Sequence, residues 1–170
     1  MKNYEPNVNV VLRNENNEKK TTSAVKLDSS INEEKKNVQY SNVIATIEIP
    51  KISLRRSLYK IGSKENNVNK NVEILKDSNM PDIKNGNFIL AAHNGNTSVG
   101  HFKNLHKINI GDLVTINYNG QDYTYEISKK YDVLKTGTVM VKRNKEKNTI
   151  TLITCLGNDR QLVVIGYLKQ

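Results

Sequence analysis

The chain holds a single cysteine, Cys155, which ends a run of β-branched and aliphatic residues that begins at Thr149. Arg160 opens the next such run, which extends to Leu168. These residue types fit a pleated, half-buried surface and predict two strands. The linker between them, residues 156–159, has turn chemistry, so we expect a hairpin in which Cys155 and Arg160 face each other across the ladder. Because a nearby positive charge favours the thiolate, this pair is a candidate nucleophilic site.

Nucleophilic cysteine catalysis also needs a proton carrier, and three histidines compete for that role. His93 directly follows Phe88–Ala92, a short apolar run that predicts a strand buried on both faces. His101 and His106 lie on or near a predicted short helix over 100–107, on a more polar background. His93 is therefore the best candidate, and only the fold can bring it to Cys155.

Each of these residues also has a purely structural interpretation. A lone cysteine at a strand end is most often a small buried hydrophobe, and a lone histidine after a strand is often a hydrogen-bonded rim residue. An arginine at a strand end is usually a solvated edge charge. The conjunction of all three favours catalysis.

Charge and polarity divide the chain into two parts. Residues 1–40 carry 7 basic and 6 acidic residues and few large apolar side chains, which indicates a polar linker or N-terminal arm. Residues 41–170 carry 19 basic and 11 acidic residues, hence +8 of the net charge of +9, and form the predicted domain. The chain shows no apolar stretch approaching 18 residues and no apolar signal segment, so we expect neither a membrane span nor a signal peptide in it.

The pattern of the domain predicts an all-β fold with one or two short helices. The clearest signal is a hairpin, Leu113 to Tyr118 and Gln121 to Ile127, around Asn119-Gly120, which suits a type I′ turn. Alternation continues from there to about Leu134. Residues 69–75 predict one or two helical turns with an asparagine cap. The remaining predicted strands are 43–49, 52–59, 88–92, a short one at Val139 and Val141, and the two runs that flank the linker.

Five segments in order resemble the sortases, the cysteine transpeptidases of Gram-positive surfaces. Thr151-Leu152-Ile153-Thr154-Cys155 resembles their Thr-Leu-x-Thr-Cys signature, and Arg160 with its aliphatic strand resembles their arginine-bearing final strand. The other three segments are Ile47-Glu48-Ile49-Pro50-Lys51-Ile52, Ala91-Ala92-His93-Asn94-Gly95 and Gly100-His101-Phe102-Lys103-Asn104-Leu105. Together they span about Val43 to Leu168, and a class A-like or class D-like form fits best.

The resemblance implies an eight-stranded sortase-like β-barrel with a groove that ends at Cys155. It implies that Cys155 attacks the Thr–Gly bond of a Leu-Pro-x-Thr-Gly-like sorting signal and forms a thioacyl intermediate. His93 would carry the proton, and Arg160 would bind the substrate backbone and stabilise the oxyanion. Thr154 and Ala92 are expected to contact the substrate.

The resemblance also implies partners and a place in the cell. The acceptor would be an amine of peptidoglycan or of a pilin lysine, and the enzyme would act at the extracellular face of the membrane. We expect the membrane anchor typical of the family in the full-length protein, outside this chain. We expect no cofactor, and no metal, because residues 142–147 hold one acid, Glu146, among four basic residues.

Alternative functions remain open. A cysteine peptidase with water as acceptor would use the same residues. A basic β-barrel could instead bind nucleic acid. This chain shows no basic stripe interleaved with aromatic residues, so we expect no nucleic-acid partner. A phosphatase-like Cys–Arg loop needs five intervening residues, against four here, and a helix after the arginine. We expect the arm, residues 1–40, to be either a stalk between the membrane and the domain or a lid that folds over the groove.

Overall fold

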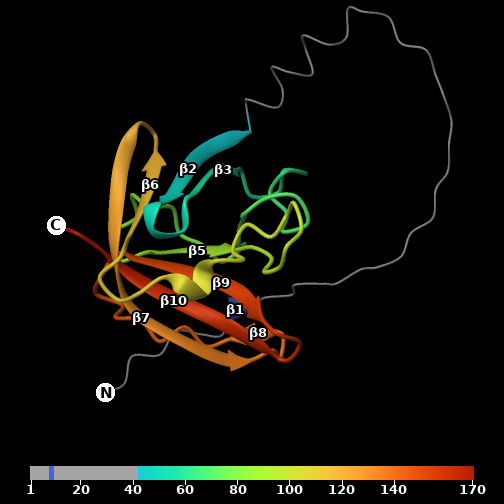
Figure 1. The fold of residues 1–170 in the computed structure, drawn as a ribbon. Helices are drawn as coiled ribbons and strands as arrows, with labels where there is room; N and C mark the ends of the chain where they lie inside the picture. Colours follow the sequence, from blue (N-terminus) through green and yellow to red (C-terminus); the bar gives the residue numbers. More distant parts are fainter. Residues whose placement is uncertain (1–7, 10–41) are drawn as a thin grey trace, which may run out of the picture.

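The computed structural model describes residues 8–9 and 42–170, and eight strands of this part form one sheet that curls into a nearly closed barrel (Figure 1). Neighbouring strands follow the order β3-β2-β6-β7-β10-β9-β5-β4, and the edge strands β3 and β4 contact each other. Every pair is antiparallel except β5 and β9, which are parallel. The all-β prediction is confirmed. The strands are β2 (Val43–Ile49), β3 (Leu54–Tyr59), β4 (Glu73–Ile74), β5 (Asn87–Ala91), β6 (Leu113–Tyr118), β7 (Gln121–Leu134), β9 (Thr149–Leu156) and β10 (Arg160–Leu168).

The longest strand, β7, joins the two halves of the barrel. It pairs with β6 over 121–126 and with β10 over 125–134, and Figure 1 shows it running from the β6 hairpin along the length of the molecule. The hairpin turn between β6 and β7 has Asn119 at φ 52° and Gly120 at φ 77°, as a type I′ turn requires. The predicted hairpin is therefore confirmed, including its extension to Leu134.

Two hydrophobic clusters lie on opposite faces of β9 and β10. Side chains alternate between the faces of a strand, so Leu152, Leu162 and Val164 enter the large cluster inside the barrel. Ile153, Val163 and Ile165 enter a second cluster on the other face. Cys155 packs at the edge of this second cluster, which places the thiol on the outer face of the barrel.

The remaining elements of the described chain are short. The 3-10 helices η2 (Pro50–Ile52) and η3 (Leu105–Lys107) are the helical elements there, and η3 lies within the segment predicted as a short helix. β8 (Thr138–Val139) pairs with β1 (Val8–Asn9) in a separate two-stranded sheet. Apart from these two residues of β1, the predicted arm over 1–40 lies outside the described residues.

The prediction of helical turns over 69–75 is wrong. This segment consists of turns followed by β4, which pairs with β5. The Asn66 side-chain amide donates to the carbonyl of Ile74, and its oxygen accepts the N–H of Ile74. The Glu73 carboxylate accepts the backbone N–H of Val68. These side-chain contacts satisfy the backbone in place of helical hydrogen bonds.

Candidate active site

Cys155 lies one residue before the end of β9, partly exposed, with its side chain at the edge of the second cluster. The strand reads Thr-Ile-Thr-Leu-Ile-Thr-Cys-Leu, and its first six residues are buried. The rigid, buried part of β9 therefore delivers the thiol to the point where the strand reaches the surface. A thiol placed in this way is fixed in position and still accessible to a reactant.

His93 lies beside Cys155 although 62 residues separate them in the chain. Ala91 pairs with Ile153 in the parallel β5–β9 ladder, and the N–H of Ala92 donates to the carbonyl of Ile153 at 3.2 Å. After the histidine, the Asn94 side-chain amide donates to the carbonyl of Cys155 at 3.0 Å. These contacts hold the chain alongside β9 on both sides of His93. By alternation from Ala91, the imidazole emerges on the same face as the thiol.

The imidazole of His93 is positioned by Asn69, and its surroundings favour the neutral form. Its Nε2 lies 2.9 Å from the side-chain oxygen of Asn69, which can only accept a hydrogen bond, so Nε2 carries the proton and Nδ1 has a free lone pair. Partial burial lowers the pKa of His93, and the charges of Lys135 and His101 lower it further. A neutral histidine with one nitrogen available can accept a thiol proton.

Replacing Asn69 by alanine is expected to lower kcat on whatever substrate Cys155 attacks. The substitution removes one neutral hydrogen bond, about 0.5–1.5 kcal/mol, which corresponds to roughly a 2- to 10-fold loss. The imidazole would lose its orientation, while KM would change little. The matched control is Lys70→Ala, because the adjacent Lys70 side chain makes an exposed ion pair with Glu65. Equal losses in both variants would contradict the proposed role of Asn69.

The pairing of Cys155 with Arg160 is a correction to the sequence prediction. Arg160 pairs with Leu156, and the residue directly opposite Cys155 is Gln161. β9 extends one residue beyond the cysteine, so a three-residue loop of Gly157, Asn158 and Asp159 replaces the expected linker of four. A shift of one residue reverses the face of every side chain in a strand. Arg160 therefore belongs to the face opposite the thiol, and its Nε donates to the Asp132 carboxylate on β7.

Thr154 and Ala92 hold the histidine segment against β9. The hydroxyl of Thr154 donates to the carbonyl of Ala92 at 2.7 Å, and both residues are buried. This bond fixes the spacing between the strand that carries Cys155 and the segment that carries His93. Contact of these two residues with a substrate stays a prediction.

The other two histidines are held by backbone carbonyls. Nε2 of His101 lies 3.1 Å from the carbonyl of Lys70, and Nδ1 of His106 lies 3.0 Å from that of Lys103. Among residues 8–9 and 42–170, no group of three His, Cys, Asp or Glu side chains is arranged to hold a metal ion. The open hollow of about 810 Å³ near Asn117–Gly120 lies by the β2 and β6 strands and includes neither Cys155 nor His93, so it is separate from this site.

Comparison with known proteins decides the family. Residues 47–169 match the sortase domain family. This range covers most of the chain and all the elements that place Cys155 and His93. The chain belongs to the sortase family. Sortases are cysteine transpeptidases of the Gram-positive cell surface, and none of the helices described for this sortase is long and apolar enough to cross a membrane.

The similar proteins represent several sortase classes. Sortase A of Bacillus anthracis is 30% identical over 129 residues, 74% of this chain and 60% of that protein. Sortase C1 of Streptococcus agalactiae is 27% identical with a TM-score of 0.65, covering 76% of this chain and 69% of that one. A Clostridium perfringens sortase D5 transpeptidase is 26% identical with a TM-score of 0.62, covering 84% and 91%. The eight-stranded sortase barrel is thereby confirmed, and the class stays open among A, C and D.

Sequence reasoning missed three side chains that the structure brings to this site. Asn69 and Asn94 lie in turns, where asparagine is common for reasons unrelated to catalysis. Gln161 lies within an apolar run. Because alternate residues of a strand share a face, the pattern Gln161, Val163, Ile165 could have placed its side chain on the face of the second cluster.

Proposed function

We propose that this sortase cleaves a Leu-Pro-x-Thr-Gly-like sorting signal with Cys155 as the nucleophile and transfers the resulting acyl group to an amine. The observation that supports the proposal is the alignment of His93 and Cys155 on one face of the sheet, with a hydrogen bond to β9 on each side of the histidine. The partly exposed thiol and the neutral imidazole are the nucleophile and the proton carrier that acyl transfer requires.

The proposed first half-reaction forms a thioester. The sulfur of Cys155 attacks the carbonyl carbon of the Thr–Gly bond, and Nδ1 of His93 accepts the thiol proton. The carbon–nitrogen bond then breaks, and His93 gives the proton to the departing amine. The sorting signal remains attached to Cys155 as a thioacyl group.

The proposed second half-reaction releases the acyl group to an acceptor. An amine attacks the thioester carbonyl and passes its proton to His93, and the carbon–sulfur bond breaks. The released thiolate recovers the proton from His93, which restores the neutral pair. Acceptors of this kind are the amine of a peptidoglycan cross-bridge and a pilin lysine, and both place the reaction at the extracellular face of the membrane.

We propose that the catalytic unit is the barrel, residues 41–170. The chain spans about 60% of the length of the Bacillus anthracis sortase A that it matches, so the substrates are part of this proposal. Arg160 is the residue that the family resemblance assigns to oxyanion stabilisation. In the free protein it is bound to Asp132 on the other face of β10, so that role requires it to leave this ion pair.

The test uses the protein with a quenched library of Leu-Pro-x-Thr-Gly-type peptides and a glycine oligomer as the added amine. Mass spectrometry is expected to find peptide ligated to the amine, and protein alkylated at Cys155 is expected to give none. Hydrolysed peptide alone, at every amine concentration, would replace the transpeptidase by a cysteine peptidase. The absence of any cleavage by the untreated protein would overturn the proposal.

A further inference from the structure

Asn94 connects the two groups of the proposed acyl transfer. It directly follows His93, and its side-chain amide donates to the carbonyl of Cys155 at 3.0 Å. On the other side of the histidine, the N–H of Ala92 donates to the carbonyl of Ile153. The amide of Asn94 therefore helps to fix the distance between the imidazole and the strand that carries the thiol.

The next residue, Gly95, gives this amide a reaction of its own. The backbone nitrogen of Gly95 can attack the side-chain carbonyl carbon of Asn94, so that a new carbon–nitrogen bond closes a succinimide ring. The bond from that carbon to Nδ2 breaks, and ammonia leaves with the proton of the Gly95 amide. Water then opens the ring at one of its two carbonyls, which leaves aspartate or isoaspartate. A side chain on the second residue would hinder the attack, and glycine has none.

The surroundings of Asn94 and Gly95 leave room for this reaction. Asn94 is exposed, and a Cβ atom added to Gly95 would have no other atom within 4 Å, so water can reach both residues. Within the described residues the backbone nitrogen of Gly95 makes no hydrogen bond to another backbone group. The bond from Asn94 to the Cys155 carbonyl is a single neutral one at an exposed residue, so the side chain can leave it and turn toward Gly95.

The Asn-Gly pair at residues 85 and 86 is much less free to react. The N–H of Gly86 donates to the carbonyl of Ile83 at 3.0 Å, so the attacking nitrogen is already bound. A Cβ atom added to Gly86 would lie 2.8 Å from the Cβ of Asn79, which shows how crowded this position is. We therefore expect slow conversion at this pair.

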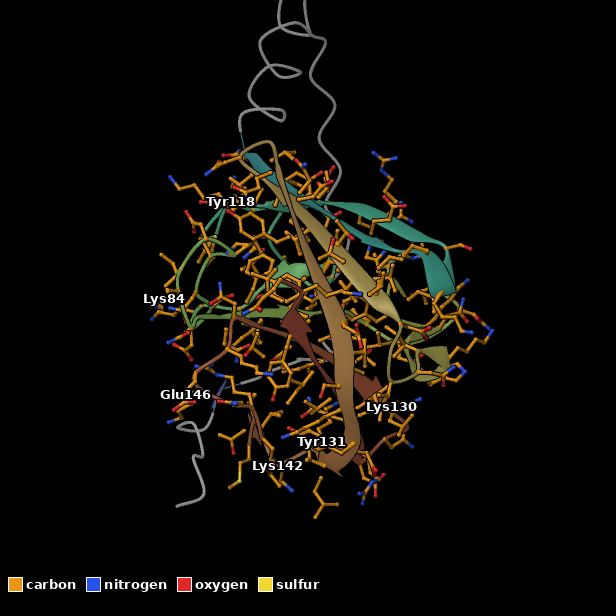
Figure 2. The ribbon with its side chains drawn as sticks, turned by 90° about the vertical axis from the view of Figure 1, so that its left-hand side faces the viewer. Lys84, Tyr118, Lys130, Tyr131, Lys142 and Glu146 are labelled. Atoms are coloured by element: carbon orange, nitrogen blue, oxygen red, sulfur yellow. The ribbon has the colours of Figure 1, made fainter. Side chains whose placement is uncertain are left out.

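The third Asn-Gly pair, Asn119-Gly120, is exposed but lies far from the thiol. It forms the turn between β6 and β7, and Figure 2 shows Tyr118, the residue before the turn, and Tyr131 near opposite ends of the molecule. Cys155 lies at the end that carries Tyr131, because its row across the sheet includes Val133 of β7. Conversion at Asn119 thus provides an internal control for conversion at Asn94.

The product at position 94 would disturb the site in two ways. A carboxylate has no N–H, so it cannot donate to the Cys155 carbonyl, and its oxygens repel that oxygen. Its negative charge, next to His93, favours the imidazolium and raises the pKa of His93, against the effects of Lys135 and His101. Isoaspartate also adds a methylene group to the main chain directly after the histidine. Each change weakens the proton carrier or moves it away from the thiol.

We propose that Asn94 is a positioning residue of this sortase and a deamidation site, and that its conversion to aspartate or isoaspartate lowers the transfer activity with time. The loss of activity rests on the proposed function, because the reaction that slows is the acyl transfer at Cys155. The deamidation itself and its effect on the imidazole do not depend on that function.

The test follows conversion and activity in the same samples. The protein is incubated at mildly alkaline pH, and peptide mapping by mass spectrometry counts the replacement of –NH₂ by –OH at each Asn-Gly pair. We expect kcat/KM for a Leu-Pro-x-Thr-Gly-type peptide to fall in step with conversion at Asn94, on the order of 10-fold when conversion is complete. The fall should be in kcat more than in KM, and conversion at Asn119 should not correlate with it.

Substitutions separate the modification from other losses. Asn94→Asp should have the low kcat/KM from the start, and the acidic limb of its pH profile should lie at higher pH than in the unsubstituted protein. Asn94→Gln retains an amide that closes a ring only slowly, so its starting activity should persist during incubation. Asn119→Asp is the matched control and should be as active as the unsubstituted protein. Asn94→Asp as active as Asn119→Asp, or an intact Asn94 in protein converted at Asn119, would overturn the inference.

A measurement without substrate distinguishes this inference from the proposed function. The imidazole signal of His93, followed by NMR against pH, should titrate at higher pH in Asn94→Asp than in the unsubstituted protein and in Asn119→Asp. An unchanged titration would contradict the inference. If the unsubstituted protein cleaves no peptide while Asn94 converts and the His93 titration moves, the proposed function is removed and the modification site remains.

Discussion

Replacing Cys155 by alanine is expected to abolish both peptide cleavage and amine ligation, with a loss of rate of about 10⁴-fold or more. The substitution removes the sulfur that attacks the sorting signal, and the described part of the chain has no other thiol to replace it. A thioacyl adduct on the intact protein, detected by mass spectrometry after acid quenching, should be absent from Cys155→Ala.

The loss in Cys155→Ala should come from chemistry alone. Cys155 is partly exposed at the edge of the second cluster, so its truncation should change the free energy of unfolding by less than about 1 kcal/mol. The matched control is Thr151→Ala, which removes a buried hydroxyl that donates to the side-chain oxygen of Asn87 and should be less stable while it retains cleavage. Cleavage by Cys155→Ala at the rate of the unsubstituted protein would exclude a cysteine mechanism.

Local turn chemistry made much of the barrel predictable. Asn119 and Gly120 both adopt positive φ, and few residue pairs other than Asn-Gly adopt this turn without strain. The turn fixes the register of β6 and β7, and the alternation that follows fixes which side chains face the core. The continuous burial of Phe88 to Ala92 likewise follows from an apolar run too short to be a helix.

The register of the β9–β10 hairpin was less accessible to sequence reasoning. The sequence suggested that β9 ends at Cys155, but Leu156 continues the strand because it packs against the large cluster inside the barrel. The turn then begins at Gly157, which adopts φ 73°. One additional paired residue moves Arg160 to the face opposite the thiol and brings Gln161 beside it. A single residue of loop length thus decides which side chain of β10 lies opposite the thiol.

The loop that positions the histidine was not predictable from local patterns. Asn69 reaches His93 because the turns of 62–72 are held by side-chain hydrogen bonds that do not follow a helical pattern, such as those between Asn66 and the backbone of Ile74, eight residues away. Asparagine has a high preference for helix caps, which led to the wrong prediction of helical turns. Tertiary contacts outweighed that local preference.

Replacing His93 by glutamine is expected to lower kcat/KM by about 10²- to 10⁴-fold, the usual contribution of a general acid–base group. Glutamine can keep a hydrogen bond to Asn69, so the loop should hold its shape while the proton carrier is lost. The control is His101→Gln, whose imidazole bonds the Lys70 carbonyl and should contribute little. Added imidazole should partly restore His93→Gln. A larger loss in His101→Gln than in His93→Gln would identify the other histidine as the proton carrier.

The pH dependence provides an independent check on His93. Burial and the charges of Lys135 and His101 lower its pKa, so the neutral, proton-accepting form should persist below the usual histidine value of about 6.5. The acidic limb of kcat/KM should therefore have its midpoint below that pH. Lys135→Met removes one of the positive charges, so the pKa of His93 should rise and this limb should move to higher pH. Lys84→Met, in the turn at 81–86, should leave the limb in place, because Lys84 is not among the groups that shift the pKa of His93. A limb that moves equally in both lysine variants would show that the profile reports net charge and not the titration of His93.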